Sequence, residues 1–319
     1  MADRLIYAGL SVNKKDAAAA QMLDERLVRY SQETRPLPGI SSVESRRAFV
    51  AQLIESRRRV EYVHRIASRD VNSKRADPSS AVFDPLKAAL HFHRCGDTDE
   101  AMWLVFLATH FGKSKQFGWQ RVRAVYGRLG QEDSWNWPRA SADPRAFRSW
   151  LGSNRHSIPG RFGNHRKYES LDAVSATGTG RVIETYIGWV LEAGGHENLV
   201  SSALAQSHAD PGLAFDLLFR SMTSVARFGR TARFDYLTMV AKLGLAAIQP
   251  NKPYMSSATG PRKGANLLFK GKSTHTEAAR LLDSWTCELG KTLDLGMQEM
   301  EDALCNWQKS PKEFKPFRG

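Results

Sequence analysis

A dense group of polar side chains lies between residues 155 and 168. Arginine, lysine and histidine side chains surround Gly160 and Gly163, which let the backbone turn sharply. Cations neutralise phosphates, while an amide, an imidazole or an aromatic ring can contact a nucleobase. The residues expected to bind phosphate are Arg155, Arg161, Arg166 and Lys167, and those expected to contact a base are Asn164, His165 and Tyr168. A solvated basic loop is the alternative.

A second basic stretch surrounds Gly229, within residues 228–237. Apolar residues recur at steps of three and four on both sides of this glycine, which predicts two helices joined by a tight turn. The N–H groups that open the second helix lack intrahelical partners, so they can point at a phosphate. The expected phosphate contacts are Gly229, Arg230, Thr231 and Arg233. An ordinary helix connector explains the pattern equally well.

Two further glycine-containing turns precede helical patterns. Residues 258–265 again place cations at a helix start, and the expected phosphate contacts there are Gly260, Arg262 and Lys263. Residues 177–180, Thr-Gly-Thr-Gly, can hold an anion in the same way, but plain capping is the commoner role of such a turn. The turn also lacks the lysine of a nucleotide P-loop.

Two carboxylates are candidates for acid–base work. Asp235 is expected in the first turn of the helix after Gly229, where it can also be a favourable charge at a helix start. Glu301 lies at the edge of the apolar stripe of the last helix, and Asp302 lies far outside that stripe. A half-buried partner of an arginine is the alternative role for Glu301. The stripe consists of Met297, Met300, Leu304 and Trp307.

We expect neither a metal nor another cofactor. His91, His93 and Cys95 alternate along a helix, so their side chains splay to different faces, and no fourth ligand is evident. The three cysteines are widely spaced and odd in number, which argues against a disulfide framework and favours a reducing cytoplasm. Trp135 and Trp137 stand in a polar loop, where they can stack on bases or close the loop.

The charge balance favours an anionic partner. The chain has 319 residues, with 46 Lys and Arg against 33 Asp and Glu, which leaves a net charge of +13. Such an excess is typical of proteins that bind nucleic acid. No window is long and apolar enough to predict a membrane span, and no obligatory protein partner is evident. The charge therefore favours nucleic acid without showing which kind, and we expect no membrane contact. The two basic glycine turns, at 228–237 and 258–265, strengthen the expectation of double-stranded DNA.

The elements that position these residues are predicted to be helices, so the fold class is all-α. Helical apolar spacing covers residues 17–30, a long stretch to about 68 that Ser41 and Glu44 can cap, and most of the chain from 86 onward. The last two helices are predicted at 276–293 and 297–307. Residues 72–80 have the composition of a linker, which predicts an N-terminal helical region of unknown role over 1–80 and a second domain over 81–319.

Four of these stretches, in fixed order along the chain, resemble the alpha-glutamyl/putrescinyl thymine pyrophosphorylase family, clade 3. They are residues 162–168, 228–237, 259–265 and 301–309. Several long motifs in order are far more specific than any one of them. The resemblance extends from about residue 102 to residue 319 and leaves the first hundred residues outside.

The resemblance implies a fold related to the helix-hairpin-helix DNA glycosylases and an action on modified bases in DNA. The implied activity is the flipping and excision of a bulky modified pyrimidine, such as glucosylated hydroxymethylcytosine, from phage DNA in antiviral defence. The relatives that give the family its name help to build hypermodified thymine, so a pyrophosphate-displacing transferase is one alternative. A non-catalytic nucleic-acid-binding protein is another, because the charge alone supports it.

The chain departs from the usual glycosylase pattern in two places. The turn keeps only Gly229 of an expected glycine pair, and no aspartate lies between Asp235 and Asp283. The catalytic carboxylate is therefore either Asp235, by its position beside the turn, or Glu301, by its helical phase. Either one would stabilise an oxocarbenium-like sugar and activate water in a monofunctional enzyme.

Overall fold

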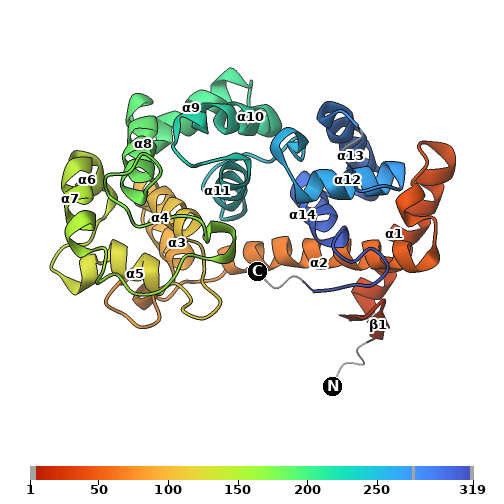
Figure 1. Ribbon diagram of the computed structural model, residues 1–319, viewed down its shortest axis with the longest axis horizontal. Helices are drawn as coiled ribbons and strands as arrows, with labels where there is room; N and C mark the ends of the chain where they lie inside the picture. Colours follow the sequence, from red (N-terminus) through yellow and green to blue (C-terminus); the bar gives the residue numbers. More distant parts are fainter. Residues whose placement is uncertain (1–4, 275–276, 317–319) are drawn as a thin grey trace. The chain divides into compact units, whose positions relative to one another are not determined.

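The computed structural model describes residues 5–274 and 277–316, and these residues form an all-α protein, as predicted (Figure 1). The described residues divide into two compact units. One unit contains residues 5–64 together with 250–274 and 277–316, and the other contains residues 65–249. The domain boundary predicted at residue 80 thus differs from the limits of these units, and the assignment of separate domains stays a prediction.

The terminal unit combines the two ends of the chain. Its helices are α1 (Lys14–Glu33), α2 (Val43–Ala67, continuing into the other unit), α12 (Gly260–Lys270), α13 (Ala279–Leu293) and α14 (Met297–Trp307). An antiparallel pair of strands, β1 (Leu5–Tyr7) and β2 (Leu10–Val12), precedes them. The sequence pattern did not predict these strands. Ala8 and Gly9 join them with positive φ angles of 48° and 89°, as a tight hairpin turn requires.

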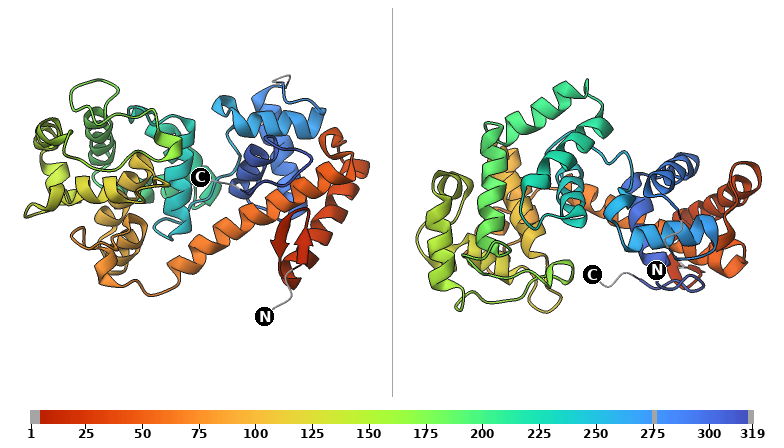
Figure 2. Two further views of the ribbon diagram at one scale, coloured as in Figure 1. Left: turned by 60° about the horizontal axis from the view of Figure 1, so that its bottom comes forward. Right: turned by 45° about the horizontal axis from the view of Figure 1, so that its top comes forward.

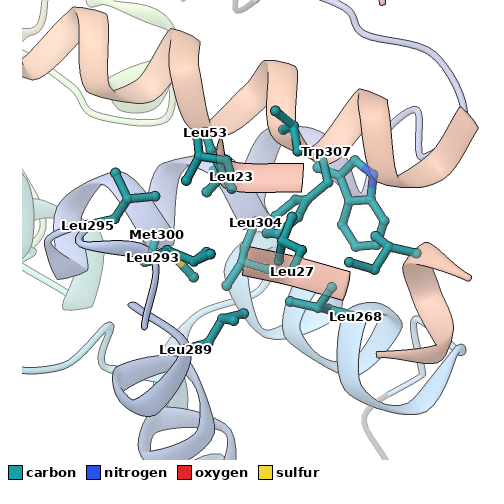
Figure 3. Close-up of a cluster of buried hydrophobic side chains, with 14 of the residues drawn as sticks. Leu23, Leu27, Leu53, Leu268, Leu289, Leu293, Leu295, Met300, Leu304 and Trp307 are labelled. Carbon is teal, nitrogen blue, oxygen red and sulfur yellow. The ribbon is translucent and has the colours of Figure 1, made fainter. Parts of the chain in front are cut away.

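The core of the terminal unit is built from residues that are far apart in the sequence. Figure 3 shows Leu23 and Leu53, from α1 and α2, close to Leu268 and Leu304, from α12 and α14. All four side chains are buried, and the rings of Trp307 and Phe49 pack at a tilt of 56° with 5.0 Å between centroids. Each buried leucine contributes about 2 kcal/mol of hydrophobic stabilisation. Neither end of the chain can therefore form this core without the other.

Glycines let α12 approach α14 closely. A Cβ atom at Gly264 would overlap the carbonyl oxygen of Leu304, and a Cβ atom at Gly260 would lie 2.6 Å from the Sγ atom of Cys305. These two glycines are four residues apart, so they lie on one face of α12. The face without side chains is the surface against which α14 packs.

The central unit, residues 65–249, contains the remaining helices. They are α3 (Pro85–Arg94), α4 (Thr98–Phe111), α5 (Gln120–Tyr126), α6 (Trp137–Ala142), α7 (Pro144–Asn154), α8 (Thr179–Glu192), α9 (His196–Gln206), α10 (Pro211–Ser221) and α11 (Arg230–Lys242). Helix α4 is buried along residues 101–108 and lies beside α3 and α11. Its Phe106 ring stacks on Tyr186 of α8, with 3.6 Å between centroids.

The sequence sets several helix starts locally. Asp84, Asp143 and Asp210 each precede a proline, and each carboxylate accepts hydrogen bonds from the N–H groups of the first turn that follows. In α2 the cap is Ser42, whose hydroxyl accepts the N–H of Ser45 at 3.1 Å. The cap therefore lies one residue beyond the Ser41 that the sequence pattern indicated. Within the described residues, no helix is both long and apolar enough to cross a membrane.

Candidate functional site

Asp235 lies on α11, the helix that follows Gly229. The helix begins at Arg230, directly after its N-cap residue Gly229, which forms no side-chain cap. Asp235 is the sixth residue of α11, so it lies in the second turn. The expectation that it lies in the first turn was wrong, because the helix starts directly after the glycine.

The connection before α11 is longer than a tight turn. Helix α10 ends at Ser221, a 3-10 turn covers Met222–Ser224, and irregular backbone leads to Gly229. The residue with left-handed backbone is Arg227, with φ 60°, whereas Gly229 has φ −66°. A Cβ atom at Gly229 would meet nothing within 4 Å. The fold of the described residues therefore does not require a glycine at this position.

The buried side chain of Arg166 reaches toward Asp235 from the loop before α8. Its Nε–H donates to the carbonyl of Thr109 at 2.9 Å, and its Nη2 atom lies 3.5 Å from Oδ2 of Asp235. Arg166 is 8% exposed, and Nη2 has no hydrogen-bond partner among the described residues. Burial lowers the pKa of Arg166, whereas the nearby charges of Asp235 and Glu169 raise it. The Nη2 group of Arg166 can therefore still donate a hydrogen bond to an acceptor.

The Asp235 carboxyl is both accessible and crowded. Its side chain is 42% exposed, yet the protein atoms around it displace much of the surrounding water, and this desolvation raises its pKa. Nearby cations act in the opposite direction. In decreasing order of effect they are Arg166, His165, Arg230 and Lys242. Solvent or a substrate can therefore reach a carboxylate that several cations surround.

A buried histidine lies behind Arg166. His110 is 1% exposed, and its Nε2 atom lies 3.0 Å from the hydroxyl oxygen of Thr179, which itself donates to the carbonyl of Ser170 at 2.6 Å. Because the hydroxyl has only one proton to donate, His110 carries its proton on Nε2. Burial and the Arg166 charge lower the pKa of His110 to about 3. His110 is therefore a neutral donor that fixes Thr179 at the start of α8.

The loop that carries Arg166 exposes the residues expected to contact a base. Asn164, His165 and Lys167 are exposed, and Tyr168 is 80% exposed. Figure 2 follows this connection, coloured yellow-green, from α7 to α8. Arg155, at the other end of the loop, pairs with Asp172 at 3.5 Å. The structure thus places the three base candidates on the same short segment as Arg166.

The Thr-Gly-Thr-Gly turn at residues 177–180 is a structural cap. The N–H of Thr179 donates to the Ser170 carbonyl, and the N–H of Gly180 donates to the Asp172 carbonyl, each at 3.0 Å. A Cβ atom at Gly180 would overlap the backbone of Ala173. Of the two roles that the sequence allowed for this turn, the described geometry therefore favours plain capping.

A chain of hydrogen bonds reaches α11 at Tyr236, the residue after Asp235. The Nδ1–H of His196 donates to Asp99 at 2.6 Å, because a carboxylate can only accept. Burial lowers the pKa of His196, so the ring is neutral and its Nε2 accepts from the Tyr186 hydroxyl at 2.7 Å. The Tyr186 oxygen in turn accepts from the Tyr236 hydroxyl at 2.9 Å. Tyr236 follows Asp235 directly, so this chain fixes the rotation of the helix that carries Asp235.

The arginines of α11 lie on aromatic rings. The guanidinium of Arg230 lies 4.6 Å from the centroid of Phe234, and that of Arg233 lies 4.3 Å from the centroid of Phe219. Arg233 also donates to the Phe219 carbonyl at 2.8 Å. Arg230 is 6% exposed, whereas Thr231 and Gly229 are exposed. The accessible part of this predicted phosphate site is therefore its backbone at the start of α11.

The other predicted residues belong to the terminal unit. Glu301 is half-buried on α14, and Lys263 is exposed on α12. Arg262 donates to the carbonyl of Glu277 at 3.0 Å, and Gly260 packs against α14. The structure thus gives Gly260 and Arg262 structural contacts, and their phosphate contacts stay predictions.

Sequence reasoning missed the environment of Asp302. Its carboxylate accepts hydrogen bonds from Ser56 at 2.7 Å, from Asn306 at 2.8 Å and from Arg59. The apolar stripe of α14 placed Asp302 outside the core, which is correct for apolar contacts but ignores α2. Ser56 and Arg59 are three residues apart, so they lie on one face of α2. This polar pair was the available signal that α2 offers a partner for a carboxylate.

The remaining candidates have structural roles in the described residues. Trp135 and Trp137 are 3% and 6% exposed, and Trp103 donates its indole N–H to the Trp135 carbonyl at 2.8 Å. They close their loop rather than offering faces to bases. Within the described ranges, no group of three or more His, Cys, Asp or Glu side chains is placed to hold a metal ion.

The arrangement around Asp235 can stabilise positive charge and orient water. An accessible carboxylate can act as a base or face a developing cation, and the buried Arg166 limits its orientation.

A family model described as alpha-glutamyl/putrescinyl thymine pyrophosphorylase clade 3 matches residues 44–319. This match begins well before residue 102, so the limit estimated from the motifs was wrong. Comparisons with curated proteins and with solved structures give no match.

Proposed function

The chain belongs to the alpha-glutamyl/putrescinyl thymine pyrophosphorylase family, clade 3, and from this premise we propose that it is a DNA glycosylase. Membership implies a function connected with modified bases of phage DNA. In our proposal the enzyme flips a bulky modified pyrimidine, such as glucosylated hydroxymethylcytosine, out of the duplex. It then hydrolyses the N-glycosidic bond, leaves an abasic site and acts in the cytoplasm as a defence against phages.

The observation that carries the proposal is the accessible Asp235 carboxylate beside the buried Arg166. As the base departs, the sugar takes on positive charge, and a nearby carboxylate stabilises that charge. The same carboxylate can accept a proton from the attacking water, whose oxygen forms the new bond to the sugar carbon. The pair of electrons from the broken bond leaves with the base. This chemistry needs neither a metal nor a lysine nucleophile.

Asn164, His165 and Tyr168 are proposed to contact the flipped base. Their exposure on the segment that carries Arg166 supports this role, since they are accessible near the same carboxylate. The exposed Gly229 and Thr231 are proposed to bring the first N–H groups of α11 against a phosphate. A helix N-terminus is a natural anion site, and Gly229, the N-cap of α11, has no side chain that would cover it.

Glu301 is the second candidate for the catalytic carboxylate. It is half-buried on α14, in the terminal unit, whereas Asp235 lies in the central unit. We prefer Asp235, because Arg166 and His165 contribute charge at that carboxyl. Replacement of each carboxylate by its amide distinguishes the two.

A transferase is the second candidate function, and the family's name favours it. In that reaction an amine replaces pyrophosphate on a carbon attached to the base, and clustered cations would bind the leaving pyrophosphate. The basic loop at 155–168 offers such cations. A non-catalytic DNA-binding protein would also use the charge, and it would keep its function without either carboxylate.

The test measures the small molecules released from DNA that contains different modified pyrimidines. We expect mass spectrometry to detect a free modified base and alkali to break the DNA at the resulting abasic sites. Asp235→Asn should lower the release rate by at least about 100-fold with little loss of DNA affinity, because only the charge is removed. Glu301→Gln is the matched comparison, and unmodified duplex is the substrate control.

Other outcomes assign the function differently. If Glu301→Gln alone abolishes release, the catalytic carboxylate is Glu301. If no base is released but an amine and a pyrophosphorylated pyrimidine give a substituted base and pyrophosphate, the protein is a transferase. If neither reaction occurs on any modified DNA, the enzymatic proposal fails and DNA binding is the remaining function.

A further inference from the structure

Two loops of the central unit meet backbone to backbone beside a group of cations. Gly163 donates its N–H to the carbonyl of Phe111 at 2.8 Å. A Cβ atom at Gly163 would lie 2.8 Å from the carbonyl carbon of Gly112, whose own φ is 67°. This contact places the segment after α4, which carries Lys113 and Lys115, against the segment that carries Arg161.

Arg121, on α5, is fixed in this junction. Its Nη2 donates to the carbonyl of Gly160, and its guanidinium lies 4.7 Å from the centroid of the Phe162 ring. Arg161 lies over the Phe117 ring at 6.0 Å and is exposed. The hydrogen bond and the Phe162 ring thus limit the conformational freedom of Arg121 before any ligand binds, whereas Arg161 stays accessible to solvent.

The two arginines repel each other. Arg121 contacts the Gly160 carbonyl and the Phe162 ring, so it lies against the segment that carries Arg161. Burial lowers the pKa of Arg121, and the Arg161 charge lowers it further. The sequence contains no Asp or Glu from residue 101 to 131 or from 144 to 168. Among the described residues, neither arginine forms an ion pair with a carboxylate, and the same holds for Lys113 and Lys115. Like charges that the fold holds together favour an anion between them.

We propose that Arg121 and Arg161, flanked by Lys113 and Lys115, bind a phosphate group, which we name the Arg121/Arg161 phosphate site. The Nε–H and Nη2–H of Arg121 donate to the carbonyls of Pro159 and Gly160, so its Nη1 group is left for a phosphate oxygen. The exposed guanidinium of Arg161 can bind the same phosphate through paired N–H donors. This proposal rests on the proposed function, because it assigns these four residues to binding a phosphate of the substrate. That phosphate can be a backbone phosphodiester of DNA or a free pyrophosphate, and the experiment separates these sources.

The first arm measures affinity for an unmodified duplex by fluorescence anisotropy over a range of NaCl concentrations. Arg161→Ala removes an exposed cation, so we expect normal folding, weaker binding and a slope of log affinity against log salt that is smaller by about 0.9. Lys113→Ala with Lys115→Ala should reduce the slope further. The matched control is Lys291→Ala with Lys312→Ala, which removes two exposed charges from the terminal unit.

The second arm titrates sodium pyrophosphate into the full-length protein in a calorimeter. If Arg161→Ala changes only the DNA slope, the phosphate is that of the DNA backbone. If pyrophosphate binds the wild type and Arg161→Ala abolishes that binding, the site takes pyrophosphate. If Arg161→Ala and the double lysine variant behave like the control in both arms, the phosphate site is refuted. Arg121→Lys is a second check, because it retains the charge and loses the paired donors.

This test is independent of catalysis. It uses unmodified duplex and pyrophosphate, so its result does not depend on the release of any base. If no base is released but Arg161→Ala still reduces the salt slope of DNA binding, the phosphate site is supported and only the glycosylase proposal fails. A lost salt effect with normal base release would refute only the phosphate site.

Discussion

Glu100 is a buried carboxyl in the first turn of α4. It is 2% exposed, and it accepts hydrogen bonds from the Tyr126 hydroxyl at 2.7 Å and from the Trp137 N–H at 2.6 Å. Burial raises its pKa to about 7, and those two hydrogen bonds do not fully offset the cost of burying the charge. The nearby charges of Asp97 and Asp99 add to the rise.

We predict that stability falls as pH rises from about 4.5 to about 7 because of Glu100. Between these values the folded protein keeps the proton that the unfolded chain has released, so the free energy of unfolding decreases with pH. The full change corresponds to about 3 kcal/mol. Glu100→Gln cannot titrate, so its stability relative to the wild type should increase by that amount between pH 4.5 and pH 8 in urea denaturation.

The control for this experiment is Glu33→Gln, which changes an exposed carboxylate at the end of α1. The pH-dependent change measured for Glu100→Gln is compared with that of this surface variant. A Glu100→Gln variant whose difference from the wild type is independent of pH would show that Glu100 is ionised in the folded protein throughout the range.

At the scale of the elements, the α12–α14 contact depends on glycine. We predict that Gly264→Ala destabilises the protein by about 2 kcal/mol or more, because its methyl group would overlap the Leu304 carbonyl and push the helices apart. Thermal denaturation followed by circular dichroism measures this change.

The matched control is Gly188→Ala in α8, where a Cβ atom meets nothing within 4 Å. Alanine is the better helix former, so this variant should be more stable by about 0.5–1 kcal/mol. If both variants are stabilised, the close approach of α12 and α14 is relaxed in solution and the glycine contact has no role.

The sequence predicted the elements well where the signal was local. The apolar stripe of α14 predicted its bounds, Met297–Trp307, and Gly229 marked the start of α11. The β1–β2 hairpin was missed, because strands of three residues are too short for a period of two to be recognised. Trp135 and Trp137 were placed in a polar loop, but their burial depends on α4, which sequence spacing cannot show.

The candidate site was predictable in its parts and not in its assembly. Residue types indicated Asp235 and Arg166 separately, as a possible acid–base group and a phosphate ligand. Their approach to 3.5 Å depends on how the loop before α8 folds over the end of α4, which is a tertiary contact. Arg121 escaped notice for a related reason, since its contacts with Gly160 and Phe162, next to Arg161, are tertiary.

At the scale of the whole molecule, the division into two units makes a prediction about fragments. Residues 65–249 contain their own aromatic core around Phe106 and Tyr186, so this fragment should fold alone and unfold in one cooperative transition. Residues 1–64 should remain unfolded alone, because the apolar partners of α1 and α2 come from α12 and α14. Circular dichroism of the separate fragments measures both expectations.

Mixing fragment 1–64 with fragment 250–319 supplies the control, since it should restore helical structure that neither piece has alone. A folded 1–64 fragment, or a 65–249 fragment without a cooperative transition, would show that the two units are not independent in folding.

The core of the terminal unit cannot form until both the N-terminal and the C-terminal helices have been synthesised. Helices α1 and α2, which carry Leu23, Leu27 and Phe49 of this core, leave the ribosome before α12 to α14. Their partners follow only after residues 65–249 have been made, which takes roughly 10–40 s at about 5–20 residues per second. During that interval the nascent chain exposes an apolar surface. The order of translation therefore leaves this surface uncovered until α12 to α14 have been made.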